Sequence, residues 1–147
     1  MMTAVSVQTD QGFRTIAKTD AYTWYADESV EAGGSATAPN PVEQLLGALG
    51  SCMAMTVQMY ATRKKWPLEK VEVHLEIHRH DAANYPAYQG DAKFIHEVSE
   101  RIVLHGDQLD DEQRARLLEI STKCPVRRVL STPTIFVEAQ NTPEGEH

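Results

Sequence analysis

The sequence predicts a single α+β domain, in which antiparallel strands are combined with a long central helix. Three observations favour this class. The chain has 147 residues, the length of one ordinary domain, and 41% of them are hydrophobic, which is enough to build a core without disulfide bonds. Short strand patterns lie before and after one long apolar stretch that carries helix start signals. We expect the domain to cover residues 1–139 and residues 140–147 to form a disordered tail.

Composition and charge exclude several classes of protein. Asp and Glu outnumber Lys and Arg by 21 to 14, which gives a net charge of −7 and disfavours nucleic acid as a partner, because phosphate backbones are repelled. The longest apolar stretch, residues 45–57, contains Gly and Ser and is shorter than the ~20 residues of a membrane span, so we expect no membrane partner. Two cysteines without a CxxC spacing and a start unlike a secretion signal favour the cytoplasm.

The first 27 residues carry the pattern of an antiparallel meander. Turn residues at positions 10–12 and at position 20 separate three strand-like runs. The runs cover residues 6–9, 13–19 and 22–27. Residues 28–41 contain a Gly-Gly and an Asn-Pro pair and predict a surface loop. Asn40 followed by Pro41 matches a helix N-cap with proline in the first helical position, so a helix should begin there.

The predicted central helix runs from Pro41 to about Lys65, roughly 35 Å at about 1.5 Å per residue. Its apolar residues cover most of its circumference, so we expect the helix to be buried. These residues are Val42, Leu45, Leu46, Leu49, Met53, Met55, Val57, Met59 and Tyr60. Small residues in its middle, among them Gly47 and Gly50, lower helix propensity and therefore predict that another backbone approaches closely there.

An alternating pattern between residues 71 and 78 predicts a half-buried strand. Its polar row could be mistaken for a metal site, but residues two apart on a strand are separated by about 6.6 Å, so we expect a solvated face. The row consists of Glu72, His74, Glu76, His78 and His80. A second strand over residues 95–105 should pair with the first. The connection, residues 81–94, either covers the site or has no part in it.

The last third of the chain predicts two helices and a closing strand. Acidic residues in a first turn indicate a helix that begins near Leu109 and ends at Lys123. A short second helix is expected over residues 125–130, with Cys124 at its N-cap and proline in its first turn. A closing strand is expected over residues 132–138.

The two cysteines, Cys52 and Cys124, are the candidate nucleophiles. The apolar middle of the central helix would by itself keep the Cys52 thiol protonated and inert. Cys124 is predicted to be the more acidic thiol, because amide N–H groups, Arg127 and Arg128 lie nearby. If the two Cα atoms come within ~6 Å, one sulfur can attack a peroxide and the other can close a disulfide. Otherwise both are core residues, as most buried cysteines are.

Two segments around these cysteines resemble a known family. The stretch from Asn40 to Cys52, NPVEQLLGALGSC, resembles the NP-x-E-x-L-x-x-A-x-x-x-C segment of the OsmC/Ohr family. The stretch from Lys123 to Leu130, KCPVRRVL, is similar to the second motif of that family, a Cys-Pro-Val followed by a hydrophobic turn. The order of predicted strands and helices also follows that family over nearly the whole chain.

The resemblance implies a fold, an assembly and a reaction. It implies an intertwined homodimer in which two curved antiparallel sheets wrap the central helices, and the reduction of organic hydroperoxides without a bound cofactor. It also implies that Cys52 attacks the peroxide, that Cys124 resolves the product, and that Arg14, the arginine of the N-terminal strands, stabilises the Cys52 thiolate.

One position departs from the family pattern. The family's hydroperoxide reductases have a glutamate ten residues before the first cysteine, which pairs with the arginine, whereas this chain has Val42 there and Glu43 next to it. On a helix with about 100° per residue, Glu43 points about 180° away from Cys52, against about 80° for the family position. The arginine–glutamate pair therefore lacks its usual glutamate, and a divergent subgroup with another substrate is an alternative.

Two functions from different classes follow. The first is a thiol-dependent peroxidase that uses Cys52 and Cys124 and is recycled by a small or lipoyl dithiol. Aromatic and methionine side chains would line its apolar pocket, the candidates being Tyr22, Trp24, Met55, Tyr85 and Tyr88. The second is a non-catalytic, dimeric binding or structural module with packed cysteines. A third hypothesis, metal binding by the two cysteines and a histidine, is favoured by no spacing in the sequence.

Overall fold

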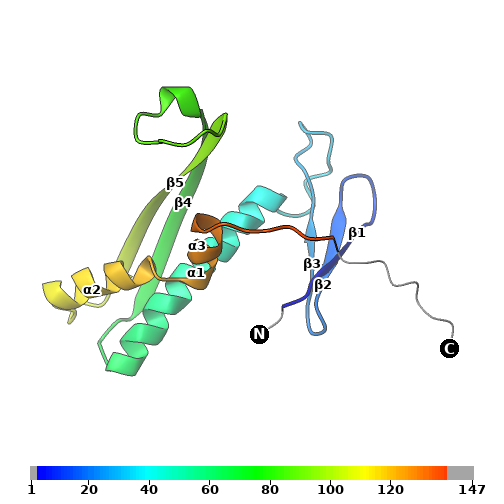
Figure 1. Ribbon diagram of the computed structural model, residues 1–147. Coiled ribbons are helices and arrows are strands. Elements are labelled where there is room, and N and C mark those ends of the chain that lie inside the picture. Colours follow the sequence, from blue (N-terminus) through cyan, green and yellow to red (C-terminus); the bar gives the residue numbers. More distant parts are fainter. Residues whose placement is uncertain (1–2, 139–147) are drawn as a thin grey trace.

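The computed structural model describes residues 3–138 and has the predicted α+β architecture, with three helices and two antiparallel sheets in that part of the chain (Figure 1). The elements follow the predicted order. They are β1 Ser6–Thr9, β2 Thr15–Lys18, β3 Thr23–Ala26, α1 Pro41–Lys64, β4 Lys70–Asp81, the 3-10 turn Ala82–Asn84, β5 Phe94–His105, α2 Asp111–Ser121 and α3 Pro125–Ser131. The boundaries of these eight strands and α-helices differ from the predicted ones by a few residues at most, and the 3-10 turn lies in the predicted connection.

The two sheets have different partners within the chain. Strands β1, β2 and β3 form a meander, and β4 pairs with β5 along its whole length, from Lys70 opposite His105 to Asp81 opposite Phe94. Helix α1 lies along the β4–β5 sheet, and the β1–β3 sheet stands apart from it, near the N-terminal end of α1 (Figure 1). The molecule therefore consists of a helix-covered hairpin and a separate small meander.

Local signals set both ends of α1. The Asn40 side chain accepts a hydrogen bond from the Glu43 amide at 2.9 Å, and the Glu43 carboxylate accepts one from the Asn40 amide at 2.8 Å, which satisfies two free donors of the first turn. At the other end Lys65 adopts a left-handed conformation with φ of 56° and closes the helix. The predicted N-cap is confirmed.

The prediction that α1 is buried on most sides is wrong for a single chain. One stripe of the helix is buried, with i, i+4 spacing: Leu49, Met53, Val57 and Ala61. Met55 and Met59 remain 63% and 72% exposed, because no other element within residues 3–138 covers their side of the helix. The expected approach of another backbone is not seen at Gly47 or Gly50: a Cβ atom at Gly50 would meet side chains of β4, with Leu75 at 3.4 Å, and one at Gly47 would meet no atom of the described residues within 4 Å.

In the polar row of β4, histidine rings lie against glutamate carboxylates. Glu72 accepts from His105 at 3.0 Å, and its other oxygen lies 3.4 Å from the His74 ring. Within residues 3–138 no group of three or more His, Cys, Asp or Glu side chains is arranged to hold a metal ion. The row is an exposed to half-exposed face on which histidine and glutamate side chains contact one another.

The core falls into two clusters. The first joins the C-terminal half of α1 to α2, and its buried residues are Val57, Ala61, Leu68, Leu109 and Leu117. The second consists of Leu49, Met53 and Cys124, all at most 3% exposed. One of the two cysteines is thus a core residue at the junction of α1, α3 and the β4–β5 sheet.

The loop between β3 and α1 is held by a buried carboxylate. Asp27 is 2% exposed and accepts hydrogen bonds from the hydroxyl and the amide of Thr37, at 2.7 and 3.1 Å. These bonds, with amide donors from Glu28 and Ser35, lower the pKa of Asp27 to about 2, since a carboxylate that accepts several hydrogen bonds is favoured in its charged form. The loop therefore holds the start of α1 in a fixed place relative to β3.

The predicted closing strand over residues 132–138 is wrong for this chain. The segment after α3 is extended but pairs with no strand of residues 3–138. Ile135, Phe136 and Val137 are 85%, 93% and 84% exposed, because no strand in the described part of the chain is paired with them. The predicted tail, residues 140–147, lies outside the described residues. None of the helices described here combines the length and apolar composition needed to cross a membrane.

Candidate active site at the two cysteines

The structure brings Cys52 and Cys124 together. Cys52 is half-buried on α1 and packs against the cluster that contains the fully buried Cys124. Both thiols are free, and the Cys52 thiol lies near enough to Cys124 to raise the pKa of the Cys124 thiol. Two sulfurs that are far apart in the sequence therefore form one pair in the fold.

Neighbouring elements fix each thiol of this pair. Leu49 and Met53, on either side of Cys52 in sequence, belong to the buried stripe of α1. This stripe packs against β4. Cys124 is the N-cap of α3, where its sulfur accepts a hydrogen bond from the Arg127 amide at 3.3 Å. A helix cap leaves its residue little conformational freedom, so the Cys124 sulfur has a defined direction.

The prediction that Cys124 is the more acidic thiol is not supported. Burial raises the pKa of the Cys124 thiol and outweighs the lowering effect of the Arg127 amide, and the neighbouring Cys52 thiol raises it further. Desolvation penalises a thiolate strongly in an apolar cluster. The Arg127 side chain, which was expected to favour the thiolate, is paired with Glu100 instead.

Glu100 is a site residue that sequence reasoning missed. It lies on β5 between Val98 and Ile102, both of which pack against the cysteine cluster. Residues two apart on a strand share a face, so Glu100 belongs to the helix-facing row of the sheet. The available signal was this acidic residue between the apolar Val98 and Ile102 of the same row.

Arg14 is not placed at the thiols within one chain. It precedes β2, forms an ion pair with Asp10 at 3.6 Å, and stacks over the Tyr25 ring at 4.3 Å. No hydrogen bond joins it to either cysteine in the part of the chain that the structure describes, and its Nε atom is buried without a hydrogen-bond partner there. The expected cation beside Cys52 is therefore absent from a single copy of residues 3–138.

The structure shows no carboxylate directed at the cysteines from Val42, the position where the family's hydroperoxide reductases have a glutamate, or from its neighbour Glu43. Glu43 is engaged in the N-terminal cap of α1, so its carboxylate is not directed at the cysteines. Val42 is 49% exposed and lines an apolar cavity instead. This position supplies no carboxylate to the site.

That apolar cavity lies next to the thiol pair. It has a volume of about 490 Å³, and two of its lining residues, Leu49 and Val98, also belong to the cysteine cluster. The other lining residues are Val42, Leu45, Leu46, Ile77, Arg79, His96 and Leu130. The aromatic and methionine residues predicted for this role are not among them: Met55 is on α1 but exposed, and the others lie on other segments.

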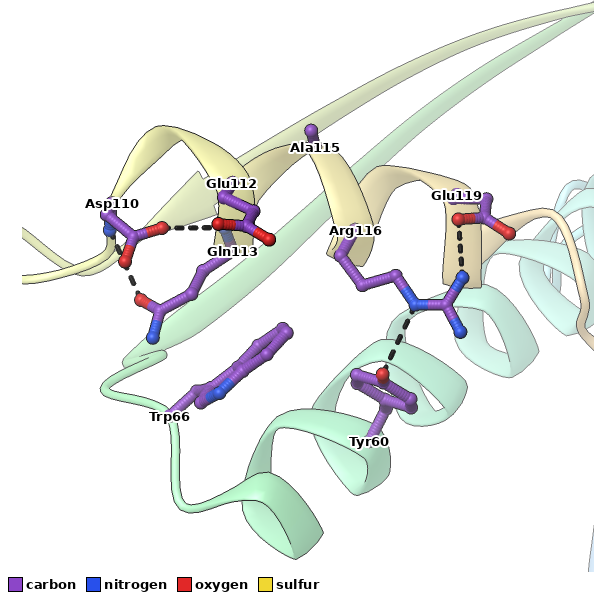
Figure 2. Close-up of a pocket in the computed structure, with 8 residues that line it drawn as sticks. All are labelled: Tyr60, Trp66, Asp110, Glu112, Gln113, Ala115, Arg116 and Glu119. Carbon is purple, nitrogen blue, oxygen red and sulfur yellow. Dashed lines mark hydrogen bonds and ion pairs between the residues drawn. The ribbon is translucent and has the colours of Figure 1, made fainter.

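A second, more polar cavity lies between α1 and α2, away from the thiols (Figure 2). Arg116 crosses it, donating from Nε to the Tyr60 hydroxyl at 3.2 Å and forming an ion pair with Glu119. The Arg116 hydrogen bond lowers the pKa of Tyr60, and the Trp66 ring packs edge-on against the Tyr60 ring with centroids 5.5 Å apart. The cavity joins two helices and contains no thiol.

Comparison with known proteins agrees with this architecture. A family model described as OsmC-like protein matches residues 33–139. No match was found among curated proteins.

Solved structures share the fold at low sequence identity. An OsmC-like protein from Mycoplasma pneumoniae is 17% identical, with a TM-score of 0.69 and coverage of 88% of this chain and 87% of that one. A protein from Legionella pneumophila, described as an organic hydroperoxide resistance protein OsmC, is 16% identical, with a TM-score of 0.62 and coverage of 89% and 91%. At these identities the likeness shows the fold.

Proposed function

Because this chain belongs to the OsmC-like protein family, we propose that it is a thiol-dependent peroxidase that reduces organic hydroperoxides with Cys52 and Cys124. The observation that carries this proposal is that Cys52 packs against the apolar cluster that contains Cys124, with both thiols free. Two cysteines on packed neighbouring elements can form a disulfide if their Cα atoms lie within about 7 Å. Hydroperoxide resistance in the name of the Legionella relative supports the same reaction class.

The reaction needs three steps. The Cys52 thiolate attacks the distal oxygen of ROOH, the O–O bond breaks, and ROH leaves after taking a proton, which gives a Cys52 sulfenic acid. The Cys124 sulfur then attacks the Cys52 sulfur, a disulfide forms, and water leaves. A dithiol reductant, such as a lipoyl group, returns both thiols and is itself oxidised to a disulfide. Cys52 is assigned the first attack because it is half-buried, whereas Cys124 is fully buried.

The apolar cavity supports a preference for organic hydroperoxides. Its volume of about 490 Å³ is in the range of small-molecule sites. Burial of an alkyl or aryl group there contributes about 25 cal/mol per Å² of apolar surface, a contribution that hydrogen peroxide cannot make. The cavity shares Leu49 with the cysteine cluster, so a substrate held in it would present its peroxide group near Cys52.

We also propose that the working unit is a homodimer. The extended segment with Ile135, Phe136 and Val137, and the uncovered side of α1 with Met55 and Met59, together expose a large amount of apolar surface. Surfaces of this kind are typical of interaction sites. A second copy would cover them, and Arg14 of that copy is then a candidate for the cation that a single chain does not bring to Cys52.

The dimer proposal predicts a molecular mass of two chains in light scattering. Replacing Phe136 by aspartate should shift the mass toward one chain, because a charge in an apolar interface is not solvated. Replacing Arg14 by glutamine should leave the mass unchanged and slow peroxide-dependent oxidation of Cys52. A wild-type mass of one chain at micromolar concentration would contradict the proposal.

The function itself is tested by counting free thiols. Adding one equivalent of cumene hydroperoxide to the fully reduced protein should remove two thiols per chain within seconds to minutes, and a dithiol should restore them. The same amount of hydrogen peroxide should act more slowly, because it gains nothing from the apolar cavity. The proposal assigns the protein to the cytoplasm, where such reductants keep thiols reduced.

One specific observation favours the alternative, a binding or structural module with packed cysteines. Cys124 is 0% exposed, and burial raises its pKa, as expected for an inert core cysteine. This alternative predicts an unchanged thiol count after hours with excess cumene hydroperoxide. That result would rule out the peroxidase and leave the fold assignment intact.

A further inference from the structure

An ion pair between Glu100 and Arg127 lies beside the thiol pair, and the three steps above do not use it. We propose that Arg127 is a positioning residue for the resolving step: together with Glu100 it fixes the Cys124 sulfur beside Cys52 and sets the charge around that sulfur. The inference rests on the roles proposed for the two cysteines. It assigns a role to two residues outside the thiol pair.

Arg127 contacts the site through both its backbone and its side chain. Its amide donates to the Cys124 sulfur at 3.3 Å, and its guanidinium donates to the Glu100 carboxylate on β5. One residue therefore links the sulfur to the sheet. Any displacement of this link would move the sulfur relative to α1, which packs on the same sheet.

Glu100 is placed to make this link stiff. It lies between Val98 and Ile102 in the helix-facing row of β5; the residue as a whole is exposed, and 20% of its side-chain surface is accessible. Within residues 3–138 the ion-pair partner of this carboxylate is Arg127. Each of the two charges is therefore held in place by the other.

The remaining groups around Cys124 do not duplicate this pair. Helix α1 contributes the Cys52 thiol, and β4 contributes the apolar side chains of Val73 and Leu75. Before Cys124 in the chain, Lys123 is paired with Glu119 at 2.7 Å. Arg128 follows Arg127 on α3, and no ion pair or side-chain hydrogen bond is recorded for its guanidinium in residues 3–138.

The pair acts on the resolving step through charge. Cys124 must lose its proton when it attacks the Cys52 sulfenic acid, so negative charge develops at a buried sulfur. The Arg127 cation favours that charge and the Glu100 carboxylate opposes it. Removing the Arg127 charge should therefore raise the pKa of the Cys124 thiol, and removing the Glu100 charge should lower it. A purely mechanical link would be weakened in the same way by both changes.

The test measures ionisation of Cys124 in a Cys52→Ser background, with no peroxide present. The Cβ chemical shift of ¹³C-labelled cysteine reports the thiol directly and does not require access to reagents. Glu100→Gln should move the titration midpoint to lower pH and Arg127→Gln to higher pH, each by about one pH unit, the size expected for one charge several ångström away at an effective dielectric constant near 20. The double variant should lie close to the Cys52→Ser parent.

Two further variants serve as controls. Arg127→Lys keeps the charge and should stay near the parent, and Arg128→Gln makes the same change of net charge one residue further on and should shift the midpoint less than Arg127→Gln. The proposal would be overturned if Glu100→Gln and Arg127→Gln moved the titration midpoint of Cys124 in the same direction, or if neither variant moved it. If Arg127→Gln does not fold, Glu100→Gln decides alone, because a midpoint that is unchanged or higher contradicts the inference. Since no peroxide is used, a failure of the peroxidase proposal would leave this measurement unaffected.

Discussion

Replacing Cys52 by serine is expected to lower the rate of organic hydroperoxide reduction by about 10³-fold or more. The hydroxyl of serine is a far weaker nucleophile toward a peroxide oxygen, and the Cys124 thiol cannot take over, because it is fully buried and burial raises its pKa. The measurement is the consumption of cumene hydroperoxide with a dithiol as the reductant. Serine is close to cysteine in size, so the fold should be retained.

Replacing Cys124 by serine is the matched control for this prediction. This variant should still react once with the peroxide but should stop at the sulfenic acid, because the resolving sulfur is missing. Dimedone should then label Cys52 in the Cys124→Ser variant and should label the wild type only weakly. Dimedone labelling of Cys124 in the Cys52→Ser variant, with no label on Cys52 in the Cys124→Ser variant, would show that the two roles are reversed.

The parts of the fold that follow from neighbouring residues were predictable. The start of α1 at Pro41 depends on a capping box that is complete within four residues, Asn40 to Glu43. The N-cap of α3 at Cys124 depends in the same way on the proline that follows it. The β4 strand was predicted from its alternating pattern, and its polar row is an exposed to half-exposed face on which histidine and glutamate side chains contact one another.

The parts that depend on distant or missing partners were not predictable in the same way. A strand forms only where another strand offers free backbone groups, so β-type residues such as Ile135 and Val137 did not ensure a strand in residues 132–138. The same holds for the exposed side of α1, where an apolar pattern indicated burial but only one stripe is covered by this chain. Both errors concern surfaces for which a partner had been assumed.

The candidate site also combines features set by neighbouring residues with features set by distant ones. The sequence could indicate two cysteines within motifs that resemble those of the OsmC/Ohr family. The pKa of the Cys124 thiol, however, depends on nearby charges and on burial, and therefore on how the chain packs. Arg127 was expected to favour the thiolate, and Glu100, which is 27 residues away on β5, offsets that charge. The alternation on β5 contained the signal, because Glu100 interrupts a row that continues with Ile102 and Leu104.

Met53 provides a test of how far packing controls the thiol pair. Its side chain is 0% exposed and packs directly in the cluster with Cys124. Met53→Ala should lower the free energy of unfolding by about 2–5 kcal/mol, since it removes buried contacts and leaves a cavity. Urea unfolding followed by circular dichroism measures this loss.

The loss of packing should also affect the chemistry, because the cavity would lie against the Cys124 sulfur. In Met53→Ala, formation of the Cys52–Cys124 disulfide after one equivalent of cumene hydroperoxide should be slower than in the wild type, while sulfenic acid formation at Cys52 should change less. Met53→Leu is the control: it conserves volume and should cost less than about 1.5 kcal/mol and keep the rate of disulfide formation. Equal stability and equal disulfide rates for Met53→Ala and Met53→Leu would mean that the thiols are held together by something other than this cluster, which would leave the Glu100–Arg127 link as the main determinant of their geometry.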